Sequence, residues 1–167
     1  MDEVARIIEP DDVLCGLSLG ALVALHVVQR VEVGRLIVCA GFDRLPASLR
    51  RRTRAIALAA RIVPRGFMHR QFAAELPEAY RARALEELAP LRSAELSRLM
   101  WQAAGSVVDP ADITCETIVV CGQRDRPNLA LSRALAERLP KARLEIVPEA
   151  GHVANIDNPE AFSALLS

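Results

Sequence analysis

A serine flanked by two glycines is the residue of this chain best placed to act as a nucleophile. Residues 13–28 read VLCGLSLGALVALHVV, in which Ser18 stands between Gly16 and Gly20. An apolar run precedes the serine and a run of helix formers follows it, so the pattern predicts a buried strand, a sharp turn and a helix. A G-x-S-x-G in that setting is typical of the nucleophile elbow, in which a strained turn exposes the serine hydroxyl between glycine-sized neighbours.

The same turn offers a place for negative charge. The helix after Ser18 begins with unpaired N–H groups and the positive end of its dipole, and the backbone N–H of Leu19 would donate to an oxyanion. A structural βα turn, which also favours glycine, is an alternative. A phosphate-binding loop is disfavoured because Gly16 and Gly20 do not fit G-x-G-x-x-G and no G-K-[ST] follows.

A serine hydroxyl needs a base, and the imidazole that serves as base needs a carboxylate to orient it. The chain has three histidines. His26 lies inside the predicted helix, and His69 lies among arginines with no partner suggested. His152 follows Gly151 in a predicted loop after an apolar strand, at the strand end where sites form in open α/β sheets. His152 is therefore the predicted base.

Two aspartates compete for the role of orienting acid. Asp125 follows the apolar strand 117–122, and Asp43 follows the apolar strand 36–40. Both carboxylates would lie at the carboxyl end of their strand, from which they could reach a histidine. Each is also compatible with an ordinary turn or helix-cap aspartate. The residues alone leave this choice open.

The elements that must position these residues are strands and helices in alternation. Apolar runs predict buried parallel strands at 13–17, 36–40 and 117–122, and a fourth parallel strand is predicted at 144–147. Helices are predicted at 4–8, 21–30, 48–60, 77–88, 93–103 and 128–139, with a last one starting at Pro159 and capped by Asp157 or Asn158. This order predicts an α/β fold with helices on both faces of the sheet.

Composition narrows the class of function. With 21 basic and 21 acidic residues the formal net charge is +0, which gives no reason to expect nucleic acid or a membrane surface as partner. The longest apolar stretch is too short to span a bilayer, and the acidic start, MDEVARIIEP, lacks a signal-peptide pattern, so a cytoplasmic location is predicted.

The cysteines predict no metal site. No C-x-x-C occurs, which excludes the usual zinc and thioredoxin-like patterns. The four cysteines stand in apolar strands or at strand edges and are interpreted as small buried hydrophobes: Cys15, Cys39, Cys115 and Cys121. No metal or organic cofactor is expected, and a small molecule is the expected partner.

Residues 45–110 differ in pattern from what flanks them. Eight arginines and no acid occur from Arg44 to Arg70. A solvated helix face is the favoured interpretation, and attraction of an anionic substrate or partner is the alternative. Trp101, the only tryptophan, is predicted to pack in a core.

The chain resembles the α/β-hydrolase superfamily, especially its small bacterial esterase and lactonase-like members. Residues 117–125, TIVVCGQRD, are similar to that family's strand and acid, and residues 143–162, RLEIVPEAGHVANIDNPEAF, to its last strand, catalytic histidine and closing helix. The order of elbow serine, helical insertion, acid and histidine also matches.

The resemblance implies a role for each candidate. Ser18 would be the nucleophile, Asp125 the orienting acid and His152 the base. Asp43 is the runner-up acid, because some branches of the superfamily place the acid after the earlier strand. The implied reaction is hydrolysis of an ester, lactone or related acyl bond through an acyl-enzyme.

The resemblance also implies a partial fold. The hydrolase core would comprise 1–44 and 111–167, with a helical cap or lid at 45–110. The family has four strands before the elbow, which need about 60–80 residues, whereas seventeen residues precede Ser18. The chain is therefore expected to be an incomplete product of a longer gene or a naturally reduced form.

That difference supports an alternative function. The second oxyanion donor of the family comes from a loop ahead of the elbow. Without it, the chain would be a catalytically weak or inactive hydrolase fragment that acts as a structural or binding module. An open edge along Val13, Leu14 and Cys15 would also favour self-association.

Overall fold

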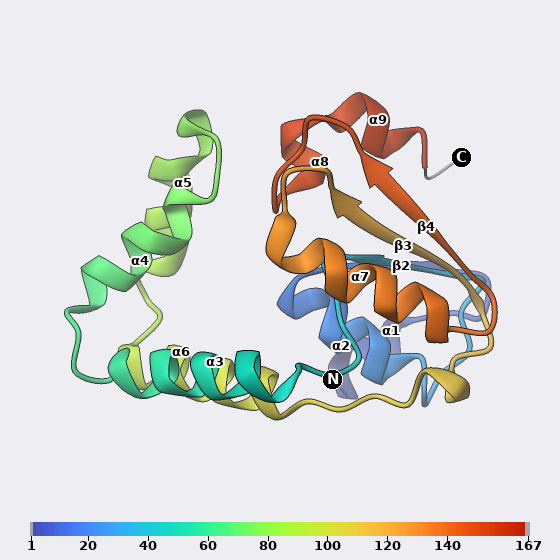
Figure 1. The fold of residues 1–167 in the computed structure, drawn as a ribbon, viewed down its shortest axis with the longest axis horizontal. Helices are drawn as coiled ribbons and strands as arrows, with labels where there is room; N and C mark the ends of the chain where they lie inside the picture. The colour runs from blue at the N-terminus through green and yellow to red at the C-terminus, as the bar shows by residue number, and fades with distance from the viewer. Residues whose placement is uncertain (1, 166–167) are drawn as a thin grey trace. The chain divides into compact units, whose positions relative to one another are not determined.

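Four parallel strands form one sheet in the order β1-β2-β3-β4 (Figure 1). In this computed structural model, which describes residues 2–165, the strands are β1 (Val13–Leu17), β2 (Arg35–Cys39), β3 (Glu116–Gly122) and β4 (Ala142–Val147). The register places Leu17 beside Cys39 and Cys39 beside Val120. Because all four strands run in the same direction, the loops that follow them all leave the sheet at the carboxyl ends of the strands.

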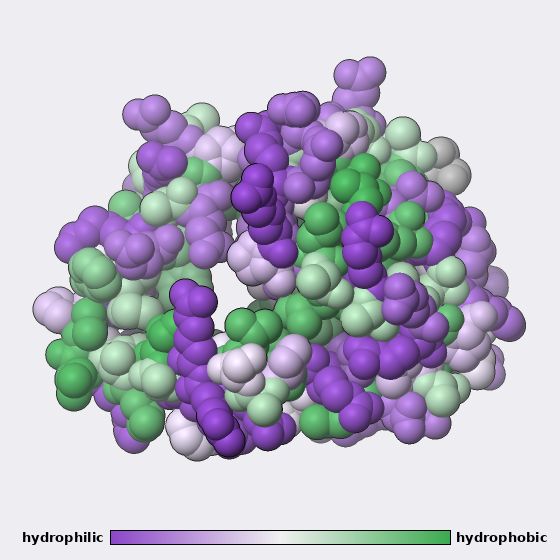
Figure 2. Space-filling view, in the orientation of Figure 1, coloured by the Kyte–Doolittle hydropathy of each residue, from purple (hydrophilic) through white to green (hydrophobic). Residues whose placement is uncertain are grey.

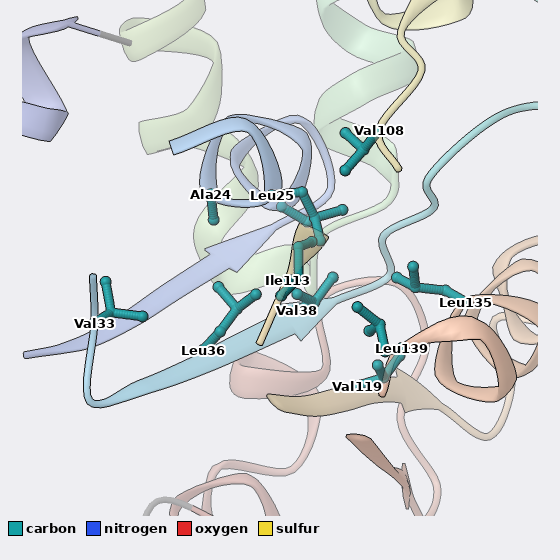
Figure 3. Packing of buried hydrophobic residues seen from close by; sticks show 11 residues of the cluster. Ala24, Leu25, Val33, Leu36, Val38, Val108, Ile113, Val119, Leu135 and Leu139 are labelled. Carbon is teal, nitrogen blue, oxygen red and sulfur yellow. The ribbon is translucent and has the colours of Figure 1, made fainter. Parts of the chain in front are cut away.

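One face of the sheet is covered by α2 (Leu19–Val27) and α7 (Arg126–Arg138), with α1 (Asp2–Ile7) beside α2. Figure 3 shows Leu25 and Leu135 from these helices pointing toward Val38 and Val119 of the sheet. The burial of these β-branched and leucine side chains away from water is the main force that holds the layers together.

The opposite face is covered by two short helices, α8 (Ala154–Asp157) and α9 (Pro159–Ser163). Ala154 and the partly buried Phe162 pack there against Ile37 and Ile118. Asn158 caps α9 by accepting a hydrogen bond from the Ala161 N–H. The prediction of four parallel strands flanked by helices is confirmed.

The contacts divide the chain into two units. The sheet unit holds the residues up to Asp43 and from Val107 onward, and the second unit is Arg44–Ser106. Val108 belongs to the sheet unit, because its side chain is buried in the core and its N–H donates to the Asp43 carbonyl. A short 3-10 turn, η1 (Pro110–Asp112), follows it.

The second unit consists of four helices between β2 and β3, so the helical insertion at this point of the chain is confirmed. They are α3 (Ala47–Ala59), α4 (Arg65–Ala74), α5 (Glu78–Leu88) and α6 (Ser93–Gly105). α3 packs against α6, and α4 packs against α5. A small apolar core forms around Ala60, Met68 and Leu96.

Two helices, α4 and α8, occur where the sequence pattern predicts none. α4 has the sequence RGFMHRQFAA and buries only Met68, His69 and Ala73. Its apolar residues are too few and too mixed with polar ones to show a clear helical period. α8 is a single turn of four residues, which is below the length at which periodicity can be recognised.

The prediction that Trp101 packs in a core is wrong. Its side chain is 42% exposed, and the Arg54 guanidinium lies 4.8 Å from the centre of its ring. Trp101 stands at the margin of the α6 face that buries Leu96 and Ala104, so one side of the ring is left for a cation–π contact.

His69 is buried with Nε2 3.2 Å from the Leu91 carbonyl oxygen, a partner that the sequence does not suggest.

The interpretation of all four cysteines as buried hydrophobes holds only in part. Cys39 and Cys121 are buried, Cys115 is half-buried and Cys15 is exposed. The exposure of Cys15 has a simple cause: β1 is the first strand in the sheet order and pairs only with β2 among residues 2–165.

Within residues 2–165, no helix has both the length and the apolar character that a bilayer span requires.

Candidate active site

Ser18 occupies a sharp turn between β1 and α2. Its backbone has φ 55° and ψ −112°, a conformation that residues with a Cβ rarely adopt. Its N–H donates to the Cys39 carbonyl at 2.8 Å, which continues the β1–β2 ladder and fixes the turn. Ser18 is the N-cap of α2, yet its side chain makes no capping hydrogen bond. The strain and the uncommitted hydroxyl are the features expected of a nucleophile elbow.

The two glycines of the elbow are not equivalent. A Cβ on Gly16 would lie 2.4 Å from the backbone oxygen of Gly20, so only glycine allows α2 to start this close to β1. A Cβ on Gly20 would meet nothing within 4 Å among the residues described. The expectation that both positions need glycine is therefore wrong for Gly20, whose Cβ would point into open space.

The start of α2 provides a hydrogen-bond donor beside the serine. Leu19 is the first residue of the helix, and its N–H has no acceptor among the described part of the chain. An unpaired N–H at the positive end of a helix stabilises an anion placed there. Leu19 is thus positioned to donate to an oxyanion formed at Ser18.

Asp125 and His152 are brought together from two neighbouring loops. Asp125 follows β3 as the N-cap of α7, and His152 lies in the loop after β4. The Nδ1 of His152 is 2.8 Å from Asp125 Oδ2. The aspartate side chain is 5% exposed and that of the histidine 23%. The aspartate is thus the more deeply buried partner, and the imidazole extends from it toward the surface.

The carboxylate of Asp125 is held in its charged form. Burial raises its pKa, but hydrogen bonds from His152 and Asn128 lower it by more, so the pKa of Asp125 lies below its usual value. A carboxylate in this position fixes the imidazole tautomer in which Nδ1 carries the proton. The other ring nitrogen, Nε2, is then the atom that can accept a proton.

The loops that carry the acid and the histidine are joined to each other. The Arg124 N–H donates to the Ala150 carbonyl at 2.8 Å, and the side-chain oxygen of Gln123 accepts from the Glu149 N–H at 3.0 Å. A Cβ on Gly122 would lie 2.0 Å from the Gly151 carbonyl oxygen. Glycine at position 122 therefore allows the histidine loop to approach the end of β3.

Asp43, the runner-up acid, lies after β2 with a different partner. It is fully buried, and its carboxylate forms an ion pair with Arg138 near the end of α7. Removal of one member of such a pair leaves an uncompensated charge, so the contact gives Asp43 a structural role. The structure thus places Asp125 at His152 and Asp43 at Arg138.

One residue of the site is missed by sequence reasoning. Asn128 donates from Nδ2 to both carboxylate oxygens of Asp125 at 2.9 Å. Asn128 stands one turn into α7 as Asp-x-x-Asn, and a polar amide three residues after the candidate acid is the only sequence signal that could have found it.

The second unit has a hollow of about 520 Å³ on its own surface, between α3 and α6. It is lined by Leu58, Arg61, Ala94, Ser97, Arg98, Trp101 and Gln102. Figure 2 shows long hydrophilic side chains next to apolar ones over these helices. Except for Arg54, the arginines of residues 44–70 are exposed, as a solvated face requires. Attraction of an anion stays a prediction.

No group of three or more His, Cys, Asp or Glu side chains within residues 2–165 is arranged to hold a metal ion. What the site contains is a strained serine, a helix N-terminus and an oriented imidazole. These are the components of nucleophilic acyl transfer.

A comparison with known families decides the membership. The model of the alpha/beta hydrolase family matches residues 2–165. The chain belongs to the alpha/beta hydrolase family. The predicted resemblance is therefore confirmed.

Individual relatives of this alpha/beta hydrolase are distant. A protein of Bacillus subtilis (strain 168), provisionally named 2-succinyl-6-hydroxy-2,4-cyclohexadiene-1-carboxylate synthase, is 32% identical over 56 residues, which make up 34% of this chain and 20% of the relative. The structure of MenH from S. aureus has a TM-score of 0.82 at 14% identity, and covers 99% of this chain and 71% of that chain.

An esterase from Exiguobacterium antarcticum, EaEST, has a TM-score of 0.81 at 18% identity, with 98% of this chain and 67% of that chain covered. At these identities the likeness of the two structures shows the fold. The sequence match spans 20% of the length of the curated relative. The reaction and the substrate are therefore argued from the site itself.

Proposed function

We propose that this alpha/beta hydrolase cleaves an ester, lactone or related acyl bond with Ser18 as nucleophile, Asp125 as orienting acid and His152 as base. The observation that carries the proposal is the 2.8 Å contact between His152 Nδ1 and Asp125 Oδ2. The two residues follow β3 and β4, and the strained Ser18 follows β1 of the same parallel sheet. All three residues therefore lie at the same end of the sheet, the one formed by the carboxyl ends of its strands.

The chemistry follows from these assignments. Nε2 of His152 takes the proton from the Ser18 hydroxyl as its Oγ attacks the acyl carbon. The carbonyl oxygen becomes an oxyanion, to which the Leu19 N–H donates. When the tetrahedral intermediate collapses, the bond to the leaving group breaks and His152 returns the proton to that group. His152 then deprotonates a water that attacks the acyl carbon, which releases the acid and restores Ser18.

The substrate stays open in its details. The names of two similar proteins differ in kind, since one is called a synthase and the other an esterase. The shared requirement is an activated serine and an oriented histidine, so the proposal depends on the site geometry and not on either name. A small activated ester, p-nitrophenyl acetate, is the suitable first substrate because it makes few demands on a binding pocket.

Labelling by a fluorophosphonate tests the proposal. The probe should modify Ser18 in the folded protein, as located by peptide mass mapping. Ser18→Ala should abolish labelling, whereas Ser163→Ala, at an exposed serine of α9, should leave it unchanged. Modification of another serine with Ser18 untouched would contradict the elbow assignment.

The rival proposal, a weak or inactive hydrolase that serves as a structural or binding module, has one observation in its favour. Within residues 2–165, the Leu19 N–H is the one donor assigned to the oxyanion. Loss of one donor lowers kcat by about 10²–10³-fold. A protein that binds ligands but neither labels at Ser18 nor hydrolyses p-nitrophenyl acetate would favour this rival.

A further inference from the structure

The start of α7 offers the Asp125 carboxylate little donation from the backbone: a backbone hydrogen bond from Asn128 is the smallest of the effects that lower its pKa. An aspartate at an N-cap usually accepts hydrogen bonds from the backbone N–H of the second or third helical residue. Here the second residue is Pro127, which has no N–H. The N–H of the third, Asn128, donates to the Asp125 carbonyl at 3.1 Å. Asp125 accordingly makes no side-chain capping bond.

The side chain of Asn128 lowers the pKa of that carboxylate more than its own backbone N–H does. Its Nδ2 is 2.9 Å from Asp125 Oδ1 and 2.9 Å from Oδ2. The same nitrogen lies 3.3 Å from His152 Nδ1, so the amide lies against both members of the pair. Asn128 is half-buried, which limits competition from water for these bonds.

We propose that Asn128 is the positioning residue of the Asp125–His152 pair: its amide holds the carboxylate so that Oδ2 faces the histidine. Asn128 touches no reacting atom and acts through Asp125. The inference rests on the proposed function for its catalytic consequence, but the geometry that it concerns is present in the folded protein whether or not the chain turns over a substrate.

Electrostatics supports the geometry. Burial alone would raise the pKa of Asp125, and hydrogen bonds from His152 and Asn128 together lower it. Other charged or titratable groups nearby are Cys121, whose Sγ lies 4.0 Å from the Asp125 carbonyl oxygen, and the Arg124–Glu149 ion pair of the joined loops. Asp157 accepts from the Gly151 N–H beside His152. These groups are identical in every variant compared.

Asn128→Asp is the decisive variant. At the third position of a helix an aspartate is favourable, because negative charge there interacts well with the helix dipole. A purely structural role in α7 would therefore survive this change. At Asp125, however, the variant replaces the amide donor by a second negatively charged carboxylate, which repels the first. It should stabilise the charged imidazolium of His152 and disturb the orientation of Asp125.

Gln29→Glu is the matched control. Gln29 donates from its side-chain amide to an Asp112 carboxylate oxygen at 3.2 Å on an exposed surface. The substitution makes the same chemical change, amide to carboxylate against a carboxylate, at a contact that belongs to neither Asp125 nor His152. Asn128→Ala is added as a neutral variant that removes the donor but keeps a good helix former.

Two measurements report on the pair. NMR titration of the His152 imidazole, assigned with His152→Gln, needs no activity. Asn128→Asp should raise the pKa of His152 by about one unit or more. The labelling rate of Ser18 by the fluorophosphonate is measured as a function of pH. The midpoint of its fall on the acidic side should move to higher pH by the same amount. In Asn128→Ala the labelling rate should fall roughly 10–100-fold through loss of orientation. Gln29→Glu should match the wild type in both.

The outcomes separate this inference from the proposed function. An unchanged His152 titration in Asn128→Asp, in protein that melts like the wild type, would overturn the positioning role. If the titration moves as expected but the wild-type chain does not label at Ser18, the positioning role stands and the proposed hydrolysis fails. If labelling occurs at a rate and pH dependence that neither Asn128 variant alters, the hydrolysis stands and the positioning role is wrong.

Discussion

At the scale of single residues, two side chains of the site lack the helix-capping hydrogen bond that is usual at their positions. Ser18 and Asp125 both stand at helix N-caps, where serine and aspartate are preferred because they accept from the first turn. Neither makes that bond. A missing cap costs about 0.5–2 kcal/mol, and such departures from local preference occur at functional sites. In the proposed mechanism, this leaves the Ser18 hydroxyl available to a substrate and the Asp125 carboxylate available to His152.

The two candidate acids should respond differently to the same substitution. Asp125→Asn removes the acceptor of the His152 Nδ1–H and allows the wrong tautomer, which lowers kcat about 10⁴-fold in a well-studied serine protease. Asp43→Asn instead leaves Arg138 without its buried partner. We expect a loss of stability there, with hydrolysis of p-nitrophenyl acetate by the folded fraction changed by much less.

Thermal melts of both variants provide the control, because they separate loss of folded protein from loss of turnover. Steady-state rates are then compared per folded molecule. If Asp43→Asn were the more damaging variant on that scale, the acid would have to be assigned to Asp43 and the Asp125–His152 contact would be structural.

The sequence indicates which residues are candidates for the chemistry more readily than it indicates the contacts that those residues make. Ser18 and His152 stand out because their residue types and strand-end positions follow the logic of the fold. The residues alone could not choose between Asp125 and Asp43, since both follow apolar strands; the family resemblance favoured Asp125, and the packed loops show that Asp125 is the one that meets the histidine. Asn128 was missed because an amide has no chemistry of its own, and its role exists only against a neighbouring carboxylate.

At the scale of elements, the close approach of α2 to β1 determines whether the elbow can form. Gly16→Ala would place a Cβ 2.4 Å from the backbone oxygen of Gly20, which cannot move without shifting the start of the helix. We expect a loss of about 1–3 kcal/mol in the free energy of unfolding, typical of overpacking, together with slower fluorophosphonate labelling of Ser18.

Gly20→Ala is the control for that variant. Gly20 has open space around it and lies in the first turn of α2, where alanine is the better helix former. Its melting temperature and labelling rate should equal or exceed those of the wild type. Equal losses in the two variants would show that the G-x-S-x-G motif is constrained by something other than the contact between residues 16 and 20.

Elements of the sheet unit were easier to predict than those of the second unit. The two central strands, β2 and β3, are nearly continuous apolar runs because both faces of the sheet are covered there, and that pattern has few competitors. In the second unit each helix buries only a few residues, and α5 buries none. With so little burial to select apolar side chains, α4 leaves almost no period in the sequence, and Trp101 was wrongly assigned to a core.

At the scale of the whole molecule, β1 is the feature with the largest consequence for solution behaviour. It is an edge strand, in which Val13 is 54% exposed and Cys15 is also exposed. Its backbone groups on the side away from β2 have no strand partner among residues 2–165. An apolar edge without a strand partner is a template for pairing with another chain. We propose that the partner is a second copy of this chain.

Cys15 requires the association to be measured with care. A hydrogen bond with the Cys39 thiol lowers the pKa of Cys15 to about 7, against the raising effect of burial. The lowered pKa favours the thiolate, which is the reactive form. Dimers could thus form covalently through Cys15 without any strand pairing. A reducing agent, and the variant Cys15→Ser, remove that route.

Under reducing conditions we expect the chain of 18.2 kDa to show at least twice its mass in light scattering, with the larger species growing as concentration rises. Val13→Lys should restore the monomer, because a strand of a second copy that paired with β1 would have to remove the new charge from water. Ile7→Lys, at another exposed apolar residue of the sheet unit, should not. A wild-type chain that stays monomeric at every concentration would show that α1 or the twist of β1 already protects the edge.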